Sequence, residues 1–273
     1  MKKRSLRQRL IGAPYVFWAA IFIVVPLLIV LYYAFTDADG SYTFDNILAL
    51  ADYKEIFWIS IKYSLIATAI TLVISYPFAY LMSRKRENVQ RIMMMLVMLP
   101  MWMNLLIRTY SWMNILEKNG IINNLLTAIG LSPIKMIGTP GAVIFGMIYN
   151  YIPYMILPIY SIMVKIEPSV LEAAEDLGSN GFSKLRRIIL PLSMPGVISG
   201  FTMVFVPSVS TFYISQKLGG KIMLVGDAIE KQIQSLYNYN LGAALSLVLM
   251  VLIVISMALM KKFAGKDDGK LYV

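Results

Sequence analysis

The feature that most constrains this chain is a series of six long apolar segments. Each has at least about 20 residues, which is the length that an α-helix needs to cross the hydrocarbon core of a bilayer. We place these segments near residues 11–35, 61–83, 92–113, 141–164, 194–214 and 240–260. The sequence therefore predicts an all-α polytopic membrane protein with six transmembrane helices, in which residues 1–273 form a single transmembrane domain.

Composition supports this fold class and excludes several kinds of chemistry. Hydrophobic residues make up 58% of the 273 residues and charged residues only 15%, and the mean hydropathy is +0.68. Such values are typical of a polytopic membrane protein. The chain has no cysteine and no histidine, which excludes disulfides, thiolate chemistry and imidazole catalysis. We predict neither a metal site nor an enzyme, because no phosphate-binding loop and no catalytic triad can be recognised.

The positive charges predict the orientation of the chain and argue against nucleic-acid binding. The net charge is +10, but lysine and arginine cluster beside the apolar segments, as they do in cytoplasmic loops of membrane proteins. The clusters lie at 2–9, 84–91, 165–187 and 261–270, whereas the alternate loops have few positive residues. The positive-inside rule then places both termini and the 165–191 loop in the cytoplasm.

The remaining loops are predicted to lie outside and to contain short helices. The loop 37–60 is acidic, and its part 46–58 favours an interfacial helix. The segments 121–129 and 225–237 have the spacing of apolar residues that an amphipathic helix requires. Two interpretations stay open for these segments, a solvated outer cap or a surface that receives an extracellular partner.

The longest charged stretch between apolar segments covers 167–191 and reads EPSVLEAAEDLGSNGFSKLRRIILP. Pro168 near its start predicts the first turn of a helix, where the missing N–H of proline costs nothing. Gly178 predicts a left-handed cap at the end of that helix, and residues 179–181 favour a turn. A second, basic helix is expected over 182–190, and it runs into the proline that ends the stretch.

The spacing of residues in this stretch follows a known pattern. The run EAA lies at 172–174, a glycine follows at 178, and after nine intervening residues the run IILP lies at 188–191. This pattern matches the EAA motif of ABC importer permeases. The resemblance implies an ATPase-coupling site formed by Glu172, Ala173, Ala174, Glu175, Asp176, Gly178, Leu190 and Pro191. The alternative is an ordinary charged loop at the membrane surface.

Nearly the whole chain, from about residue 9 to residue 262, resembles one family of these permeases. The segments that carry the resemblance are PYVFWAAIFIVVPLL, YPFAYLMSR, LPMWMNLLIRTYSW, IPYMILPIYSIM and LPLSMPGVISGFTMVFVPSVSTFYISQKLGG. They resemble the PotB family, the B-type membrane subunits of spermidine/putrescine importers. The last segment is the most specific, because it directly follows the EAA loop and is not shared by permeases in general.

The resemblance implies a type I ABC importer (MetI-like) permease fold in the plasma membrane of a bacterium. It implies a heterodimer with a homologous C-type permease, two copies of a cytoplasmic ATPase and an extracytoplasmic polyamine-binding lipoprotein. ATP and Mg would be bound by the ATPase, so no cofactor is expected in this chain. In that family the first EAA helix is the coupling helix, which inserts into a groove of the ATPase. We transfer this role to residues 169–178.

A polyamine pathway needs aromatic faces and hydrogen-bond acceptors, because an aromatic ring attracts an ammonium group by about 0.5–2 kcal/mol. The expected pathway residues are Trp102, Asn104, Tyr110, Tyr154, Ser208, Ser210, Phe212 and Tyr213. The alternative for each ring is the interfacial belt of a membrane protein. No aspartate or glutamate lies in a predicted span, so we expect the negative charge to come from the partner permease or the outer loops. Arg108 either extends to the outer surface or pairs with a carboxylate of the partner.

Other functions stay open as alternatives. Within the ABC class, the permease would carry another small solute, such as an opine, a compatible solute or a metal chelate. A secondary transporter would need a protonatable or ion-binding residue within its spans, and no such residue is visible. A channel would need a pore-lining ring or filter and would not need the EAA loop.

Overall fold

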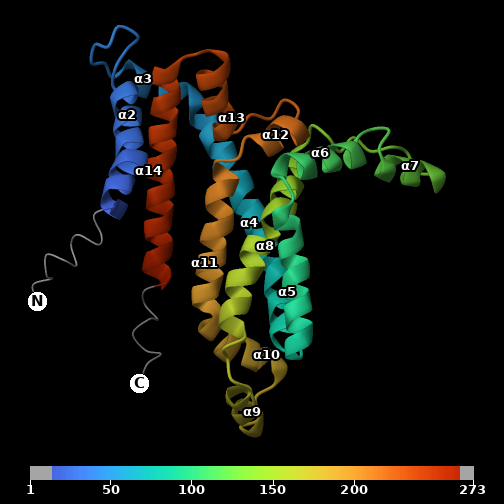
Figure 1. Cartoon of the computed structure of the whole chain (residues 1–273). Coiled ribbons are helices and arrows are strands. Elements are labelled where there is room, and N and C mark those ends of the chain that lie inside the picture. Colours follow the sequence, from blue (N-terminus) through green and yellow to red (C-terminus); the bar gives the residue numbers. More distant parts are fainter. Residues whose placement is uncertain (1–13, 265–273) are drawn as a thin grey trace, which may run out of the picture. The chain divides into compact units, whose positions relative to one another are not determined.

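The computed structural model describes residues 14–264, and every regular element among them is a helix. Contacts divide this part of the chain into two compact units, whose helices are labelled in Figure 1. Unit 1 comprises the residues up to 55 together with 228–252, and unit 2 comprises 56–227 together with the residues from 253 onward. The predicted all-α class is confirmed.

Unit 1 is built from the first apolar helix and the first part of the last one. Ala34, Ala243 and Ala244 are buried where these helices meet, and their small side chains let the two backbones approach closely. Asn240 donates a hydrogen bond to the carbonyl of Thr36 at 2.6 Å. The first helix of unit 1 covers Pro14–Ala34 and contains a π-helical turn (Ala20–Val24) and α2 (Val25–Ala34). The other elements are α3 (Asp45–Leu48), a 3-10 helix (Ala49–Tyr53), a π-helical turn (Lys231–Ser235) and α14 (Tyr239–Ala264). The last part of α14 belongs to unit 2.

Unit 2 contains the long helices that pack around α8. Its elements are α4 (Lys54–Ser83), α5 (Glu87–Trp102), α6 (Leu105–Leu116), α7 (Ile121–Ala128), α8 (Pro140–Met163), α9 (Pro168–Asp176), α10 (Gly181–Lys184), a π-helical turn (Leu185–Ile189), α11 (Leu190–Val209), α12 (Tyr213–Leu218) and α13 (Val225–Glu230), whose second half belongs to unit 1.

The contact between α8 and α11 is the most extensive helix pairing in unit 2, and the two helices lie side by side in Figure 1. A Cβ atom added at Gly196 would lie 2.8 Å from the carbonyl oxygen of Pro158. One added at Gly200 would lie 2.8 Å from the sulfur of Met155 and 3.1 Å from its carbonyl oxygen. Glycine at these two positions therefore lets the backbones touch, as small residues do between membrane helices.

Within residues 14–264, five helices are long and apolar enough to cross a membrane, or six if α5 and the bent helical segment that follows it, Leu105–Ala128, count as one span. The spans predicted near 141–164 and 240–260 are confirmed by α8 and α14. The first is confirmed from Pro14 onward, since its first residues lie outside the described part of the chain.

The span predicted near 92–113 is not one straight helix, and it is retained only as a bent pair of helices. α5 ends at Trp102, and the following helices turn away from it by 89°. Met103 adopts an extended conformation, and the side chain of Asn104 accepts a hydrogen bond from the backbone N–H of Leu106 at 2.8 Å. Asn104 therefore caps the start of a new helix, while Pro100 lacks the N–H that would continue the old one.

The second and fifth spans have different ends from those predicted. α4 begins at Lys54 and follows α3 and the 3-10 helix without a break, so the helix predicted within 46–58 leads into the span. The fifth span runs over Gly181–Val209. The basic helix predicted over 182–190 is present, but it does not end at Pro191, because α10 and the π-helical turn continue into α11. Such a π-helical turn accommodates the missing N–H of proline within a membrane helix. Residues 211–214 lie beyond the span.

Candidate functional site

The loop between α8 and α11 forms two helices joined by a sharp reversal, and we call residues 164–190 the coupling loop. Pro168 occupies the first turn of α9, as predicted. Gly178 has a φ of +76° and donates to the carbonyl of Glu175 at 2.8 Å, while Ser179 donates to Ala174 at 2.9 Å. These two bonds are a Schellman cap, in which the left-handed residue is best a glycine. The predicted cap is confirmed.

An ion pair joins the two helices of the coupling loop. The ammonium group of Lys184 on α10 pairs with the carboxylate of Glu175 on α9. Asn180 caps α10, because its side chain accepts from the N–H of Ser183 at 2.8 Å. Glu175 is thus engaged within the loop, whereas Glu172 and Asp176 are exposed without such a pair.

The other residues of the EAA motif divide between two places. Ala173 is exposed and Ala174 is buried, so only one of the two alanines is available for close approach by another protein. Leu190 and Pro191 lie on the first turn of α11, away from α9 in the chain, and both are exposed. The structure therefore brings together 172–178 but does not place 190–191 on the same helix.

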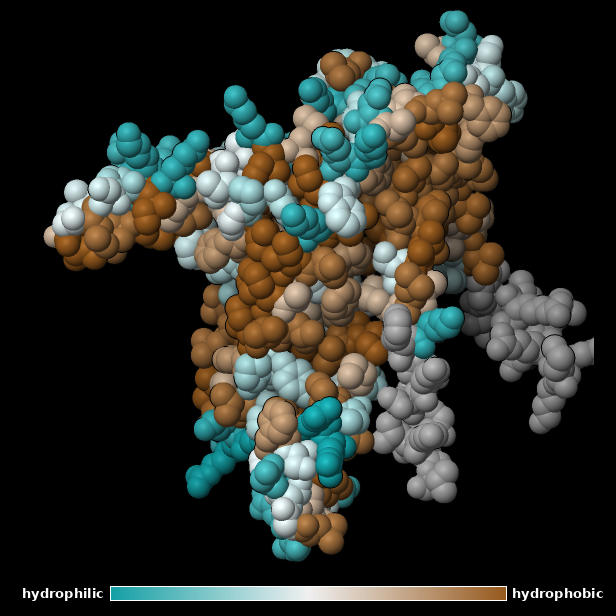
Figure 2. Space-filling view, turned by 180° about the vertical axis from the view of Figure 1, so that it is seen from behind, coloured by the Kyte–Doolittle hydropathy of each residue, from teal (hydrophilic) through white to brown (hydrophobic). Residues whose placement is uncertain are grey.

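Two apolar side chains at the reversal were missed by the sequence analysis. Leu177 is 89% exposed and Phe182 is 72% exposed. Figure 2 shows that the surface near this end of unit 2 is otherwise mixed and largely hydrophilic, whereas the middle of the helices is apolar. Large apolar side chains held in solvent next to charged ones are a frequent sign of a protein–protein contact. The available signal was their position on either side of the predicted glycine cap.

A cleft of about 580 Å³ separates α9 from the turn between α4 and α5. It is lined on one side by Arg84, Lys85 and Gln90, and on the other by Glu172 and Glu175. Basic and acidic groups thus face each other across it at the end of unit 2 that carries the coupling loop.

Two of the eight predicted pathway residues lie together. The rings of Tyr110 and Tyr213 meet edge to face, with centroids 6.0 Å apart. The ammonium nitrogen of Lys217 lies 5.0 Å from the centroid of Tyr110 and 5.6 Å from that of Tyr213. Desolvation raises the pKa of the Tyr213 hydroxyl to about 12. The pair is an aromatic site that already holds one ammonium group.

The other predicted pathway residues are dispersed. Ser208 is fully buried and donates to the carbonyl of Val204 in its own helix, while Ser210 donates to Val206 at the end of α11. Trp102 is 79% exposed at the end of α5. The remaining members are Asn104, which caps α6, Phe212, which precedes α12, and Tyr154, whose ring contacts Tyr151.

Arg108 does not extend to the surface of the subunit. Only 6% of the residue is exposed, and its Nε and Nη1 atoms are buried without a hydrogen-bond partner in the described residues. An unpaired buried guanidinium is costly, and pairing of Arg108 with a carboxylate of the partner stays a prediction.

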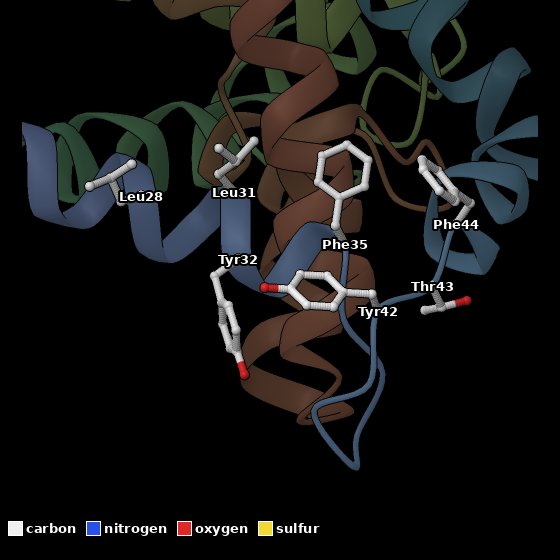
Figure 3. Close-up of a pocket in the computed structure, with 7 residues that line it drawn as sticks. All are labelled: Leu28, Leu31, Tyr32, Phe35, Tyr42, Thr43 and Phe44. Atoms are coloured by element: carbon white, nitrogen blue, oxygen red, sulfur yellow. The ribbon is translucent and has the colours of Figure 1, made fainter.

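Unit 1 has an apolar pocket of about 410 Å³ at the end of α2 (Figure 3). Its walls are Leu28, Leu31, Tyr32, Phe35, Tyr42, Thr43 and Phe44. The lining has no carboxylate, so this pocket supplies no negative charge to a multiply charged amine.

Comparison with known proteins agrees with these features. Residues 75–266 match the family described as "Binding-protein-dependent transport system inner membrane component". The spermidine/putrescine transport system permease protein PotB of Haemophilus influenzae is 40% identical over 249 residues, which are 87% of each chain. The PotB protein of Escherichia coli is 36% identical and covers 86% of this chain and 89% of its own length.

Solved structures show the same fold. A bacterial ABC transporter involved in the import of the acidic polysaccharide alginate has a TM-score of 0.77 at 18% identity, and the match covers 96% of this chain and 97% of that one. The alginate transporter in complex with its pentasaccharide-bound periplasmic protein gives 0.75 at 18% identity, with 93% of both chains covered. The chain is a multi-pass membrane permease and belongs to the family of inner membrane components of binding-protein-dependent transport systems.

Proposed function

We propose that this permease carries polyamines, spermidine or putrescine, into the cytoplasm by alternating access in an ATP-driven importer. The observation that carries the proposal is the identity with spermidine/putrescine permeases over most of the chain. We further propose a homologous C-type permease, two copies of a cytoplasmic ATPase and an extracytoplasmic polyamine-binding protein as partners. ATP hydrolysis takes place in the ATPase, and this chain, a single permease domain, is not catalytic.

The coupling loop is proposed to be the contact with the ATPase, with both termini and this loop in the cytoplasm. The exposed carboxylates of Glu172 and Asp176 support it, because they are available to basic groups of a partner. Leu177 and Phe182 support it further, because burying them in a groove would remove apolar surface from water. Gly178 holds Leu177 at the reversal, where it projects from the loop.

The tyrosine pair of α6 and α12 is proposed as one contact of the substrate pathway. Lys217 supports this role, because its side chain ends in a primary ammonium group like the two ends of putrescine or spermidine. Aromatic faces bind such groups by about 0.5–2 kcal/mol. We propose that the negative charge of the pathway comes from the partner permease, since the apolar segments of this chain contain no carboxylate.

The experiment that tests the substrate is uptake of labelled putrescine and spermidine into vesicles that contain the complete complex, binding protein included. We expect ATP-dependent uptake that each unlabelled amine competes away. Stimulation of ATP hydrolysis by a binding protein loaded with a different solute, without polyamine uptake, would instead identify a permease for that solute. A complex without the ATPase is the control and should show no uptake.

A further inference from the structure

We propose that Arg84, Gln90 and Tyr160 fasten the base of the coupling helix α9 to the turn between α4 and α5. We call these three residues the base clamp. They act as positioning residues, because they link α9 to α4 and α5, so that a displacement of α9 also moves these two helices. The inference rests on the proposed coupling function of α9, but it does not depend on which substrate is carried.

Arg84 joins the end of α4 to the chain that leads into α9. Its Nη1 donates to the carbonyl of Ile166 at 3.2 Å, and its Nη2 donates to the carbonyl of Met163 at 3.5 Å. Met163 is the last residue of α8, and α9 begins at Pro168. A cation at the C-terminus of a helix is stabilised by the helix dipole, and the ring of Tyr80 lies 5.6 Å from the guanidinium carbon. The guanidinium therefore bridges α4 and the start of the coupling loop.

Gln90 makes the second connection and uses both ends of its amide. Its nitrogen donates to the carbonyl of Ser83 at 3.1 Å and to that of Lys85 at 2.8 Å. Its oxygen accepts from the hydroxyl of Tyr160 on α8 at 2.8 Å. Because each polar atom has a partner, the amide has one preferred orientation. The turn between α4 and α5 is thus tied to the last turn of α8 at a second point.

The cleft beside α9 explains why these few bonds matter. A space of about 580 Å³ lies between the turn of α4 and α5 and the body of α9, and on the α9 side Leu171 packs against the core of unit 2. The clamp holds the start of the coupling loop, and Glu175 pairs α9 with α10, whereas Glu172, Asp176 and Leu177 stay exposed and available to the ATPase. A displacement applied to α9 therefore reaches α4 and α5 through Arg84, Gln90 and Tyr160.

α5 can carry such a displacement to the other end of unit 2. It has 16 residues and is therefore about 24 Å long at ~1.5 Å per residue. It ends at Trp102, directly before the break at Met103. A tilt of α5 that starts at the clamp would change the angle of this break. Movement of the coupling helix is thereby linked to α6, which carries Tyr110.

The first test measures how much substrate is transported per ATP hydrolysed by the complete complex. Gln90→Leu, Tyr160→Phe and Arg84→Gln should each lower this ratio by about fivefold, which corresponds to the loss of one hydrogen bond of ordinary strength. The double variant Gln90→Leu with Tyr160→Phe should lower the ratio no further than a single substitution does, because both substitutions remove the same hydrogen bond. Arg84→Lys should restore the ratio in part, because it keeps the charge but not the two bonds.

The matched control is Arg86→Gln, since Arg86 is exposed on the same turn. It should transport like the unchanged protein. Tyr160→Phe removes only a hydroxyl group and keeps the ring, so it tests the hydrogen bond in a variant that should fold normally. Normal coupling in Gln90→Leu and Arg84→Gln, with normal amounts of assembled complex, would overturn the proposal.

A second test needs no substrate. Spin labels at Asn88→Cys on α5 and Ser179→Cys at the end of the coupling loop are specific, because the chain has no cysteine of its own. In the unchanged protein, the distribution of distances between the two labels should be the same with and without trapped ATP. In Gln90→Leu this distribution should become broader. A distance that changes on ATP binding in the unchanged protein would show that α9 moves independently of α5. Failure of polyamine uptake would not affect this measurement.

Discussion

At the scale of the residue, the coupling loop depends on local backbone chemistry. Gly178 was identified from sequence because a left-handed cap has one preferred residue and needs no knowledge of the rest of the fold. The same holds for Pro168 at the start of α9. By contrast, the ion pair of Lys184 with Glu175 depends on how the two helices fold back on each other.

The structure sharpens what a substitution of Gly178 should do. A Cβ atom there would meet nothing within 4 Å, so the cost lies in the φ of +76° and not in a clash. A left-handed conformation costs other residues about 1–2 kcal/mol, and asparagine less. We expect Gly178→Val to lower ATP-driven uptake strongly and Gly178→Asn to keep most of it, with both proteins present in the membrane. Equal uptake by the two variants would contradict the cap as the cause.

The tyrosine pair gives a second prediction at this scale. Tyr110→Leu removes one aromatic face and should raise the KM for polyamine uptake by about 2- to 30-fold. Lys217→Gln should lower the KM, because the resident ammonium group no longer competes for the rings. Tyr42→Leu is the control, since Tyr42 is an exposed tyrosine of unit 1. An unchanged KM in Tyr110→Leu would remove this pair from the pathway.

At the scale of the element, hydropathy predicted where helices lie better than where they end. The average hydropathy over a window of residues is the same for a straight and a bent segment, so it does not locate the break at Met103. Pro77 lies inside α4 without ending it, whereas α5 ends soon after Pro100. The difference is Asn104, whose side chain caps a new helix.

The cap at Asn104 can be tested directly. Asn104→Ala should lose about 1 kcal/mol of helix stability and expose the first turn of α6. Hydrogen exchange of the amides over 105–109 should then become faster, while Asn104→Asp should keep the slow rate because its carboxylate also accepts the bond. No difference between the two variants would mean that packing, and not the cap, holds this turn.

The base clamp shows a different limit of sequence analysis. Tyr160 bonds to Gln90 across 70 positions, and Arg84 reaches Ile166 across 82. No local pattern marks such pairs, because each residue is ordinary for its own segment. Only the fold shows that the hydroxyl of Tyr160 binds a glutamine.

At the scale of the whole molecule, the fold class and family follow from features that extend along the entire chain. Apolar segments, the alternation of positive loops and the spaced motif can be recognised even when the predicted helix ends are slightly wrong. The residues of a substrate pathway cannot be predicted in this way, because they depend on which side chains share a surface. Of the predicted pathway residues, only Tyr110 and Tyr213 are in ring contact with each other.

The orientation of the molecule gives the last prediction. Ser179→Cys in the coupling loop should react with a membrane-impermeant thiol reagent only from the cytoplasmic side. Ser41→Cys, in the exposed loop after α2, should react only from the outside. The cysteine-free parent is the control for background labelling. The reverse pattern would mean that the positive-inside rule fails for this chain.

The glycine contact of α8 and α11 restricts how the permease can change shape. Because no Cβ atom fits at Gly196 or Gly200, sliding one helix along the other by a residue would bring bulkier neighbours into positions that have no room. Shear between these two helices is therefore blocked, and rigid-body rotation remains. The α8–α11 pair should keep its internal distances throughout the transport cycle, so that opening and closing occur at its contacts with other helices.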